Sequence, residues 1–189
     1  LDKLVGVSTG PITIDGDGQV DIVSEGDSTV DGPVTITDAG GQITLDLAAT
    51  EIVDSVTLAN ESQIKMSLTG GSTIGSAVDI DTDSQTTIDL SGSSIEGDLN
   101  VETEGQVNLN LTNASIEGDV DIETGSQVKL NLKDSQIDGT VTVGSESQVD
   151  VVLKSSSVTG DLTISTPSQI DVSDCSAVDG DVSPQRACQ

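Results

Sequence analysis

Apolar and polar residues alternate along short segments of the chain, and the same alternation returns every 20 to 22 residues. The clearest example is a pair of consecutive blocks, SIEGDLNVETEGQVNLNLTNA (residues 94–114) and SIEGDVDIETGSQVKLNLKDS (residues 115–135). A period of two predicts strands with one buried face. No segment has the 3.6-residue period of an amphipathic helix, so the pattern indicates an all-β protein.

Six rows of apolar residues become visible when the blocks are aligned. Each row supplies one position per block that stays apolar while the positions beside it vary. The first row consists of Ile12, Val34, Val56, Val78, Leu99, Val120, Val141, Leu162 and Val182, and the most uniform row of Leu47, Leu68, Leu90, Leu111, Leu132 and Leu153. A single block has too few apolar side chains to form a core, so successive blocks are expected to stack on one another.

Stacking would pair every strand with the equivalent strand of the next block, at a spacing of about 4.8 Å. The sequence therefore predicts a right-handed parallel β-helix (β-solenoid) of about eight coils of 20–22 residues. The hand follows from the strong preference for right-handed parallel crossovers. Residues 1–182 are expected to form this single domain, and residues 183–189 an irregular C-terminal tail.

Two further rows mark the predicted corners. Glycine recurs where left-handed or tight-turn backbone is expected, at Gly10, Gly32, Gly97, Gly118, Gly139, Gly160 and Gly180. Glutamine precedes the longer strand at Gln19, Gln42, Gln63, Gln85, Gln106, Gln127, Gln148 and Gln169. Amides stacked at the strand spacing can hydrogen-bond along the stack, so this row is expected to form a structural ladder. An amide-lined binding face is the alternative.

The composition supports a thin, repeated core. The 189 residues include no Phe, Tyr, Trp or His. Because aromatic side chains normally supply large buried areas, Val, Ile and Leu must fill the interior here. The apolar repeat also argues against disorder, which strong acidity could otherwise indicate.

The chain carries 33 acidic and 6 basic residues, a formal net charge of −27. Such a surface repels nucleic acid and anionic membranes, and no stretch approaches the ~20 apolar residues of a membrane span. Adaptation to high salt would explain the charge, because the Debye length falls to about 3 Å at 1 M. This favours a halophilic source; a surface that collects divalent cations is the alternative.

The sequence offers little for catalysis. Histidine is absent, and both cysteines lie near the C-terminus without a neighbouring base. Paired carboxylates keep a glycosidase or a Ca²⁺-dependent polysaccharide lyase open as alternatives. However, a sugar-binding site would usually also need aromatic platforms and basic residues. We therefore expect a protein that is not an enzyme and that has no cofactor.

Carboxylates of neighbouring blocks are predicted to stack, with Asp98 above Asp119 and Glu96 above Glu117. Like charges at the strand spacing destabilise one another unless cations or salt compensate. Hard cations such as Ca²⁺ prefer oxygen ligands, but no calcium-binding motif is present. A diffuse, non-specific cation atmosphere is therefore expected rather than a defined metal site.

The regular pattern degrades at the C-terminal end, where Cys175 and Cys188 lie. A disulfide between them would close the tail over the last coil, with a stabilisation of about 3 kcal/mol from loop entropy. It would also indicate an oxidising, extracellular setting. Two unrelated thiols are the alternative.

The segments IEGDLNV, IEGDVDI, IDGTVTV and VTGDLTI resemble the coil motif of bactofilins, over about Ile95 to Val182. The resemblance implies a β-solenoid that polymerises end to end without nucleotide, as a cytoskeletal filament. This chain differs in its longer coils, its glutamine row and its terminal cysteines. Cell-surface fibres, adhesin stalks and viral spikes are similar in architecture and agree better with the acidity and the cysteines.

Taken together, these features predict a structural subunit of an extracellular or virion-surface fibre. A receptor-binding spike or adhesin module and a bactofilin-like polymer are the alternatives. The chemically unlike ends favour head-to-tail self-association over other homo-oligomers. In that arrangement the coil near Ile12 and Ile14 would meet a neighbour's last coil near Val178 and Val182.

Overall fold

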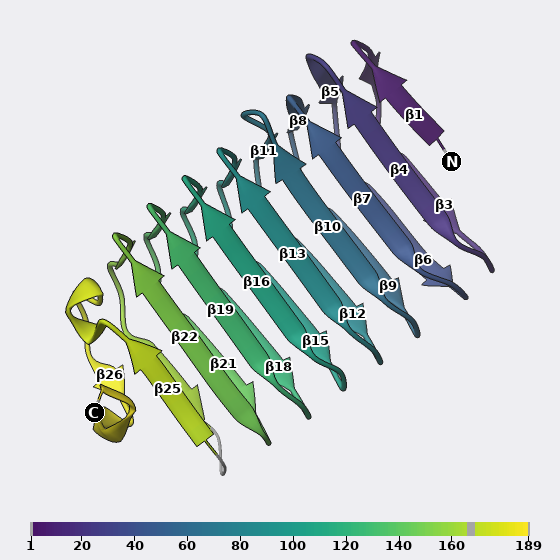
Figure 1. Cartoon of the computed structure of the whole chain (residues 1–189). Coiled ribbons are helices and arrows are strands. Elements are labelled where there is room, and N and C mark those ends of the chain that lie inside the picture. Colours follow the sequence, from purple (N-terminus) through teal and green to yellow (C-terminus); the bar gives the residue numbers. More distant parts are fainter. Residues whose placement is uncertain (1, 166–168, 189) are drawn as a thin grey trace.

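The computed structural model describes residues 2–165 and 169–188. The chain passes through three strands per turn, and each strand pairs in parallel with its equivalents in adjacent turns (Figure 1). Eight complete turns are followed by a partial ninth. This confirms the predicted parallel β-solenoid.

Three sheets run along the rod. Sheet A contains β1 (Asp2–Val5), β4 (Val20–Glu25), β7 (Ile43–Ala48), β10 (Ile64–Thr69), β13 (Thr86–Ser91), β16 (Val107–Thr112), β19 (Val128–Lys133), β22 (Gln148–Lys154) and β25 (Gln169–Ser173). Sheet B contains β2 (Ser8–Thr9), β5 (Ser28–Val30), β8 (Thr50–Ile52), β11 (Thr73–Ile74), β14 (Ser94–Ile95), β17 (Ser115–Ile116), β20 (Gln136–Ile137) and β23 (Ser157–Val158). Sheet C contains β3 (Ile12–Asp15), β6 (Val34–Ala39), β9 (Val56–Asn60), β12 (Val78–Thr82), β15 (Leu99–Thr103), β18 (Val120–Thr124), β21 (Val141–Ser145), β24 (Leu162–Ser165) and β26 (Val182–Ser183).

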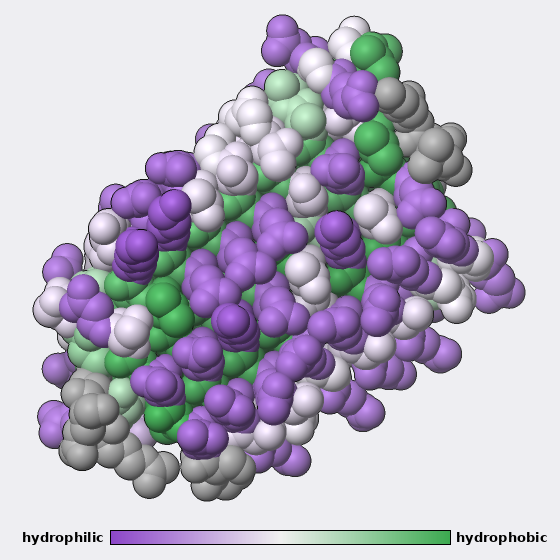
Figure 2. All heavy atoms as spheres, in the orientation of Figure 1, coloured by the Kyte–Doolittle hydropathy of each residue, from purple (hydrophilic) through white to green (hydrophobic). Residues whose placement is uncertain are grey.

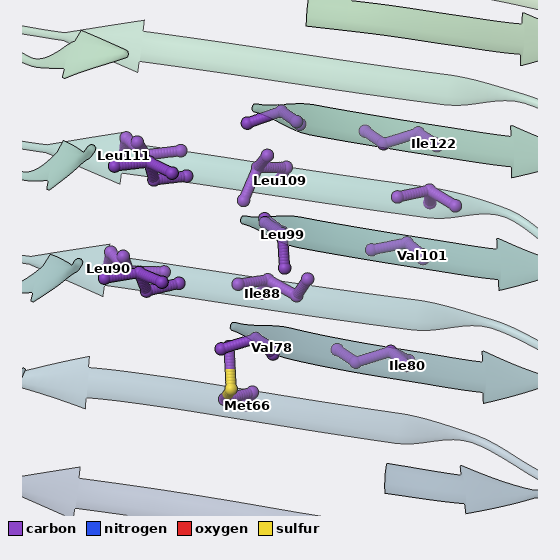
Figure 3. Close-up of a cluster of buried hydrophobic side chains, with 14 of the residues drawn as sticks. Met66, Val78, Ile80, Ile88, Leu90, Leu99, Val101, Leu109, Leu111 and Ile122 are labelled. Carbon is purple, nitrogen blue, oxygen red and sulfur yellow. The ribbon is translucent and has the colours of Figure 1, made fainter. Parts of the chain in front are cut away.

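Sheets A and C form the two broad faces of the rod, and the short strands of sheet B form a narrow side (Figure 1). The inner faces of sheets A and C pack on each other. Figure 3 shows Met66, Ile88 and Leu109 on sheet A beside Val78 and Leu99 on sheet C. The six apolar rows are inward-facing, as the alternation predicts, and their members are buried through the middle of the rod.

Two kinds of position depart from this pattern. Thr86 replaces an aliphatic residue within a row, and its fully buried Oγ1 has no hydrogen-bond partner. At the ends of the rod the rows are only partly buried, at Ile12, Ile14, Val20, Ile170 and Val182. The core is thus continuous along the axis and open to solvent only where the stack stops.

The corner between sheets A and B is left-handed in every turn. The residue directly after each strand of sheet A has φ between 50° and 67°, at Gly6, Gly26, Ala49, Gly70, Gly92, Asn113, Asp134, Ser155 and Asp174. Backbone bonds connect this corner along the rod; for example, the Asn113 N–H donates to the Lys133 carbonyl at 3.0 Å. Only glycine adopts this backbone without steric cost, and Asn and Asp tolerate it better than most residues.

The predicted glycine row at the corner between sheets B and C has a different cause. From Gly97 to Gly180 its members have no φ in the left-handed region, and among the row only Gly32 does, at 136°. A Cβ on Gly118 would lie 2.6 Å from the carbonyl carbon of Gly97, and one on Gly139 would lie 2.5 Å from the Gly118 oxygen. Of the expected left-handed or tight-turn backbone, the left-handed part is therefore wrong at Gly10 and from Gly97 onward. These corners are glycine because successive coils approach too closely for a side chain.

The two ends of the rod differ. At the N-terminal end β1, β2 and β3 are the outermost strands of their sheets. At the other end the 3₁₀ turn η1 (Cys175–Ala177) replaces a sheet B strand, and η2 (Gln185–Cys188) packs against β25 and β26. Ala187 of η2 is buried at 3% exposure, in the same cluster as the core. The last coil is therefore covered by the tail, whereas the first coil presents strand edges.

Candidate functional site and interaction surfaces

The four carboxylates predicted to attract cations lie exposed at the corner between sheets B and C. Glu96 and Glu117 follow β14 and β17 directly. Asp98 Oδ1 accepts a 2.9 Å hydrogen bond from the backbone N–H of Asp119. Asp119 Oδ1 in turn accepts one of 2.6 Å from the N–H of Thr140. The structure thus brings the two aspartates into neighbouring coils and uses their oxygens to join successive corners.

These carboxylates do not form a metal cluster. Among the residues that the structure describes, no group of three or more His, Cys, Asp or Glu side chains is arranged to hold a metal ion. The diffuse cation atmosphere stays a prediction.

Sheet C carries an acidic surface on its outward side. Strands β12, β15 and β18 expose Asp79, Asp81, Asn100, Glu102, Asp121 and Glu123. A hollow of about 510 Å³ runs across these strands between the outward side chains. Its floor at Ile80 and Val101 is strand backbone, because both side chains point into the core. A second hollow of about 450 Å³ lies at the adjoining corner and is lined by Asp81, Asp83, Glu102, Glu104, Glu123 and Glu146, with hydroxyls between them. We use the name acidic face for the outward residues of β12, β15 and β18, which are Asp79, Asp81, Asn100, Glu102, Asp121 and Glu123.

Sheet A carries the four lysines whose side chains the structure describes. These are Lys65, Lys129, Lys133 and Lys154, and all are exposed at outward positions of its strands. Lys133 lies opposite Lys154 in the adjacent coil, and Lys129 lies opposite Asp150. Figure 2 shows polar residues over the middle of this broad side, with narrow apolar strips between them. We call the four lysines and their strands the lysine face.

Side-chain amides form short ladders on the surface. Gln85 Nε2 donates to Gln106 Oε1 at 3.2 Å, and Gln106 donates to Gln127 at 2.8 Å. The ladder predicted for the whole glutamine row is thus seen in its middle, whereas Gln19 donates to Asp21 instead.

A second amide ladder, which the sequence did not suggest, crosses sheet A. Asn110 Nδ2 donates to Asp89 at 2.7 Å, and Asn131 Nδ2 donates to Asn110 at 2.7 Å. Asn110 therefore connects three coils and is not an unconstrained surface residue.

An open groove of about 760 Å³ follows the left-handed corner between sheets A and B. Its walls are small and polar, with Ser72, Ser93, Ser135 and Ser156 at one repeated position, Ala114 in the coil between Ser93 and Ser135, and Asn113 and Asp134 at the corner. Several of these hydroxyls are engaged within the fold. Ser72 Oγ, for instance, accepts a 3.1 Å bond from the Thr50 N–H and donates to the Thr69 carbonyl at 2.7 Å. The groove is thus the outer side of a structural ladder.

A corresponding ladder lies between sheets C and A. Thr103 Oγ1 accepts a 3.0 Å bond from the Gly105 N–H and donates to the Ser84 carbonyl of the preceding coil. Thr82, Thr124 and Ser145 make the same pair of bonds. Sequence reasoning missed both buried ladders because it assigned only apolar rows to the interior. Their recurrence at fixed positions in the blocks was the available signal.

Cys175 is disulfide-bonded. The sequence has one other cysteine, Cys188, whose side chain lies outside the described part of the structure. Cys175 packs against the core at the end that η2 covers, which is where the sequence placed the closure. In the described part of the chain, no helix has the length and apolar character needed to cross a membrane.

Comparison with known proteins supports the repeat architecture. The sequence model of a family described as repeats of unknown function (DUF5649) matches residues 75–144. No curated protein and no solved structure matches the chain. The family match and the three continuous sheets together show a repeat protein of the β-solenoid type.

Proposed function

We propose that this solenoid is a non-enzymatic structural protein, a rod-like subunit of an extracellular or virion-surface fibre. The observation that carries the proposal is the asymmetry of the ends. Strand edges of all three sheets are presented at β1, β2 and β3, whereas η2 covers the last coil. Unlike ends that meet form a heterologous contact, which propagates as a filament when it does not close into a ring.

The side chains along the rod support a structural role. The repeated polar residues at the corners hold the backbone in place. The side-chain oxygens of Asp98, Ser72 and Thr103 all accept hydrogen bonds from backbone N–H groups. Such bonds stiffen the stack. The sequence contributes no histidine to either hollow or to the groove.

The net charge and the cysteine chemistry support the setting. The formal net charge is −27 on 189 residues. Long-range repulsion between these charges is large in dilute buffer and is screened at molar salt. This favours a halophilic source. The disulfide at Cys175 favours an oxidising compartment.

A bactofilin-like cytoskeletal polymer is the second candidate, favoured by the Gly-Asp corner motif and by the presented edges. It differs from the first in its compartment, because a cytosolic filament would keep its cysteines reduced. A receptor-binding spike or adhesin module is the reading that remains if the rods do not assemble.

Electron microscopy of the purified protein at high salt and high concentration tests the proposal. Repeating filaments are expected for the wild type, and Ile12→Lys should abolish them while leaving the strand content seen by circular dichroism unchanged. Ile12 is suitable because it is only partly buried, in the first coil. A wild type that stays monomeric under these conditions would contradict the fibre and leave the stand-alone spike module.

A further inference from the structure

We infer that the lysine face of one rod docks laterally on the acidic face of a second copy of the same chain. The inference rests on the proposed structural function and adds a second direction of assembly, from rods to layers. Its occupant is the protein itself, identified by the opposite charges of the lysines at Lys129, Lys133 and Lys154 on sheet A and the carboxylates of the acidic face on sheet C.

The placement of the lysines is the first observation. The chain has only 6 basic residues among 189, yet all four lysines whose side chains the structure describes lie on outward positions of sheet A. Within the described residues Lys129, Lys133 and Lys154 form no ion pair. Lys133 and Lys154 are even stacked on each other across neighbouring strands, although like charges at this spacing are unfavourable. The repulsion between these two ammonium groups is unfavourable in the isolated rod. It is relieved when carboxylates of a second copy approach from outside.

The shape of the acidic face is the second observation. Asp81, Glu102 and Glu123 lie on three successive coils, and the 510 Å³ hollow between them is walled by acidic side chains over the strand backbone at Ile80 and Val101. Lysine side chains have an apolar stem and a charged head. A lysine that enters such a hollow can extend its stem between the acidic side chains and place its ammonium group among the carboxylates.

The geometry of the rod brings the two faces into register. Both sheets repeat at the same strand spacing, because every coil contributes one strand to each. Lysines on adjacent coils therefore match carboxylates on adjacent coils of a parallel neighbour. Sheets A and C lie on opposite sides of the rod (Figures 1 and 3), so the contact is heterologous and leaves a lysine face and an acidic face free on the outer rods.

Salt dependence separates this contact from end-to-end assembly. In dilute buffer the net charge of −27 keeps rods apart, and at very high salt the lysine–carboxylate attraction is itself weakened. Lateral association should therefore pass through a maximum at intermediate ionic strength. End-to-end contacts, which bury partly exposed apolar residues such as Ile12 and Ile14, should strengthen steadily with salt.

Two charge-reversed variants of the full chain provide the test. The first carries K129E, K133E and K154E, which makes both broad sides acidic. The second carries D81K, E102K and E123K, which places lysines on both broad sides. Each alone should lose lateral association, and an equimolar mixture should restore it, since every contact then has a complementary partner. Small-angle scattering measures the mass per unit length. For wild type and for the mixture it should be at least about twice the value of either variant alone, because each lateral contact adds a whole rod.

A matched control carries E51K, E96K and E117K, exposed on sheet B and its corner. It has the same net charge as the second variant and should associate laterally like wild type. If the control fails equally, or if the mixture does not recover, the inference is wrong. Growth in length without growth in cross-section would overturn the lateral contact and leave the fibre intact. Lateral pairing without growth in length would support the lateral contact and overturn the fibre. Rods that grow in neither direction would overturn both.

Discussion

Asp98 and Asp119 occupy the same corner of consecutive coils, and a side-chain oxygen of the first accepts a 2.9 Å hydrogen bond from the backbone of the second. The carboxylate that the sequence marked as a cation ligand thus has a second task within the fold. Its oxygen is needed as an acceptor, whereas its charge is not.

Replacing Asp98 with Asn should therefore be neutral or stabilising in dilute buffer, because an amide oxygen keeps the bond and removes one of two stacked charges. Replacing it with Ala should cost about 1 kcal/mol, the usual net value of an exposed hydrogen bond. Urea denaturation of both variants at low and high salt measures the difference. Equal losses for Asn and Ala would show that the charge itself stabilises the corner.

The buried serine ladder contains one natural gap. The N–H groups of Thr50, Ser72 and Ser135 each donate to the hydroxyl of the next coil. Ala114 stands where Ser93 would need such a hydroxyl, and it is 6% exposed. Ala114→Ser should therefore raise the free energy of unfolding by about 0.5–1.5 kcal/mol.

Ser135→Ala is the matched control for the gap. It removes the 3.1 Å acceptor of the Ala114 N–H and should destabilise the protein by about 1–3 kcal/mol, the cost of a buried unsatisfied donor. Thermal and urea unfolding follow both variants. A destabilising Ala114→Ser would mean that the pocket at this coil has no room for the oxygen.

The two kinds of glycine corner should respond differently to alanine. At Gly92 the Cβ would meet open space, so only the left-handed φ of 59° is unfavourable, at a cost of about 1–2 kcal/mol. At Gly118 the Cβ would lie 2.6 Å from the backbone of Gly97. Gly118→Ala would force the two coils apart, and the loss in the free energy of unfolding should exceed about 1–3 kcal/mol, the range typical of overpacking. The order of the two melting temperatures checks the assignment of causes.

The inward and outward positions of β16 provide a test of the core. Leu111 is 1% exposed, so Leu111→Asp would bury an unpaired carboxylate and disrupt its own coil and both neighbours. The neighbouring Asn110 is a poor control, because Asp there would lose its amide donor and face Asp89. Asn108→Asp is better matched, since it lies beside Lys129, and should change stability by less than about 0.5 kcal/mol. Comparable effects at Leu111 and Asn108 would contradict the orientation of the strand.

Stability should rise steeply with ionic strength, because 33 acidic residues face 6 basic ones and salt screens their repulsion. Melting curves from dilute buffer to molar KCl, with a Ca²⁺ titration alongside, test this. A flat salt response would remove the argument for a halophilic source. A sharp, stoichiometric response to Ca²⁺ would replace the diffuse atmosphere with a defined site.

The fold could be predicted from the sequence because the alternation of apolar and polar residues indicates which side chains point inward. Leu111 and its row are buried as this alternation requires. The corners were harder. Whether Gly118 is required by φ or by close approach depends on the distance between coils, which the residue type does not encode. Ser72 and Thr103 look like surface residues until the backbone N–H groups beside them are known. The gathering of Lys65, Lys129, Lys133 and Lys154 on sheet A is visible only once each strand is assigned to a sheet.

The hydrogen bonds that join the coils have a mechanical consequence. They run along the axis of the rod, so a force applied to its two ends acts directly on them and can open one coil at a time. Each opened coil of about 21 residues would add roughly 70 Å of extended chain. A rod of this kind would lengthen under tension in nearly equal steps, and the closed C-terminal turn would set where the stepping stops.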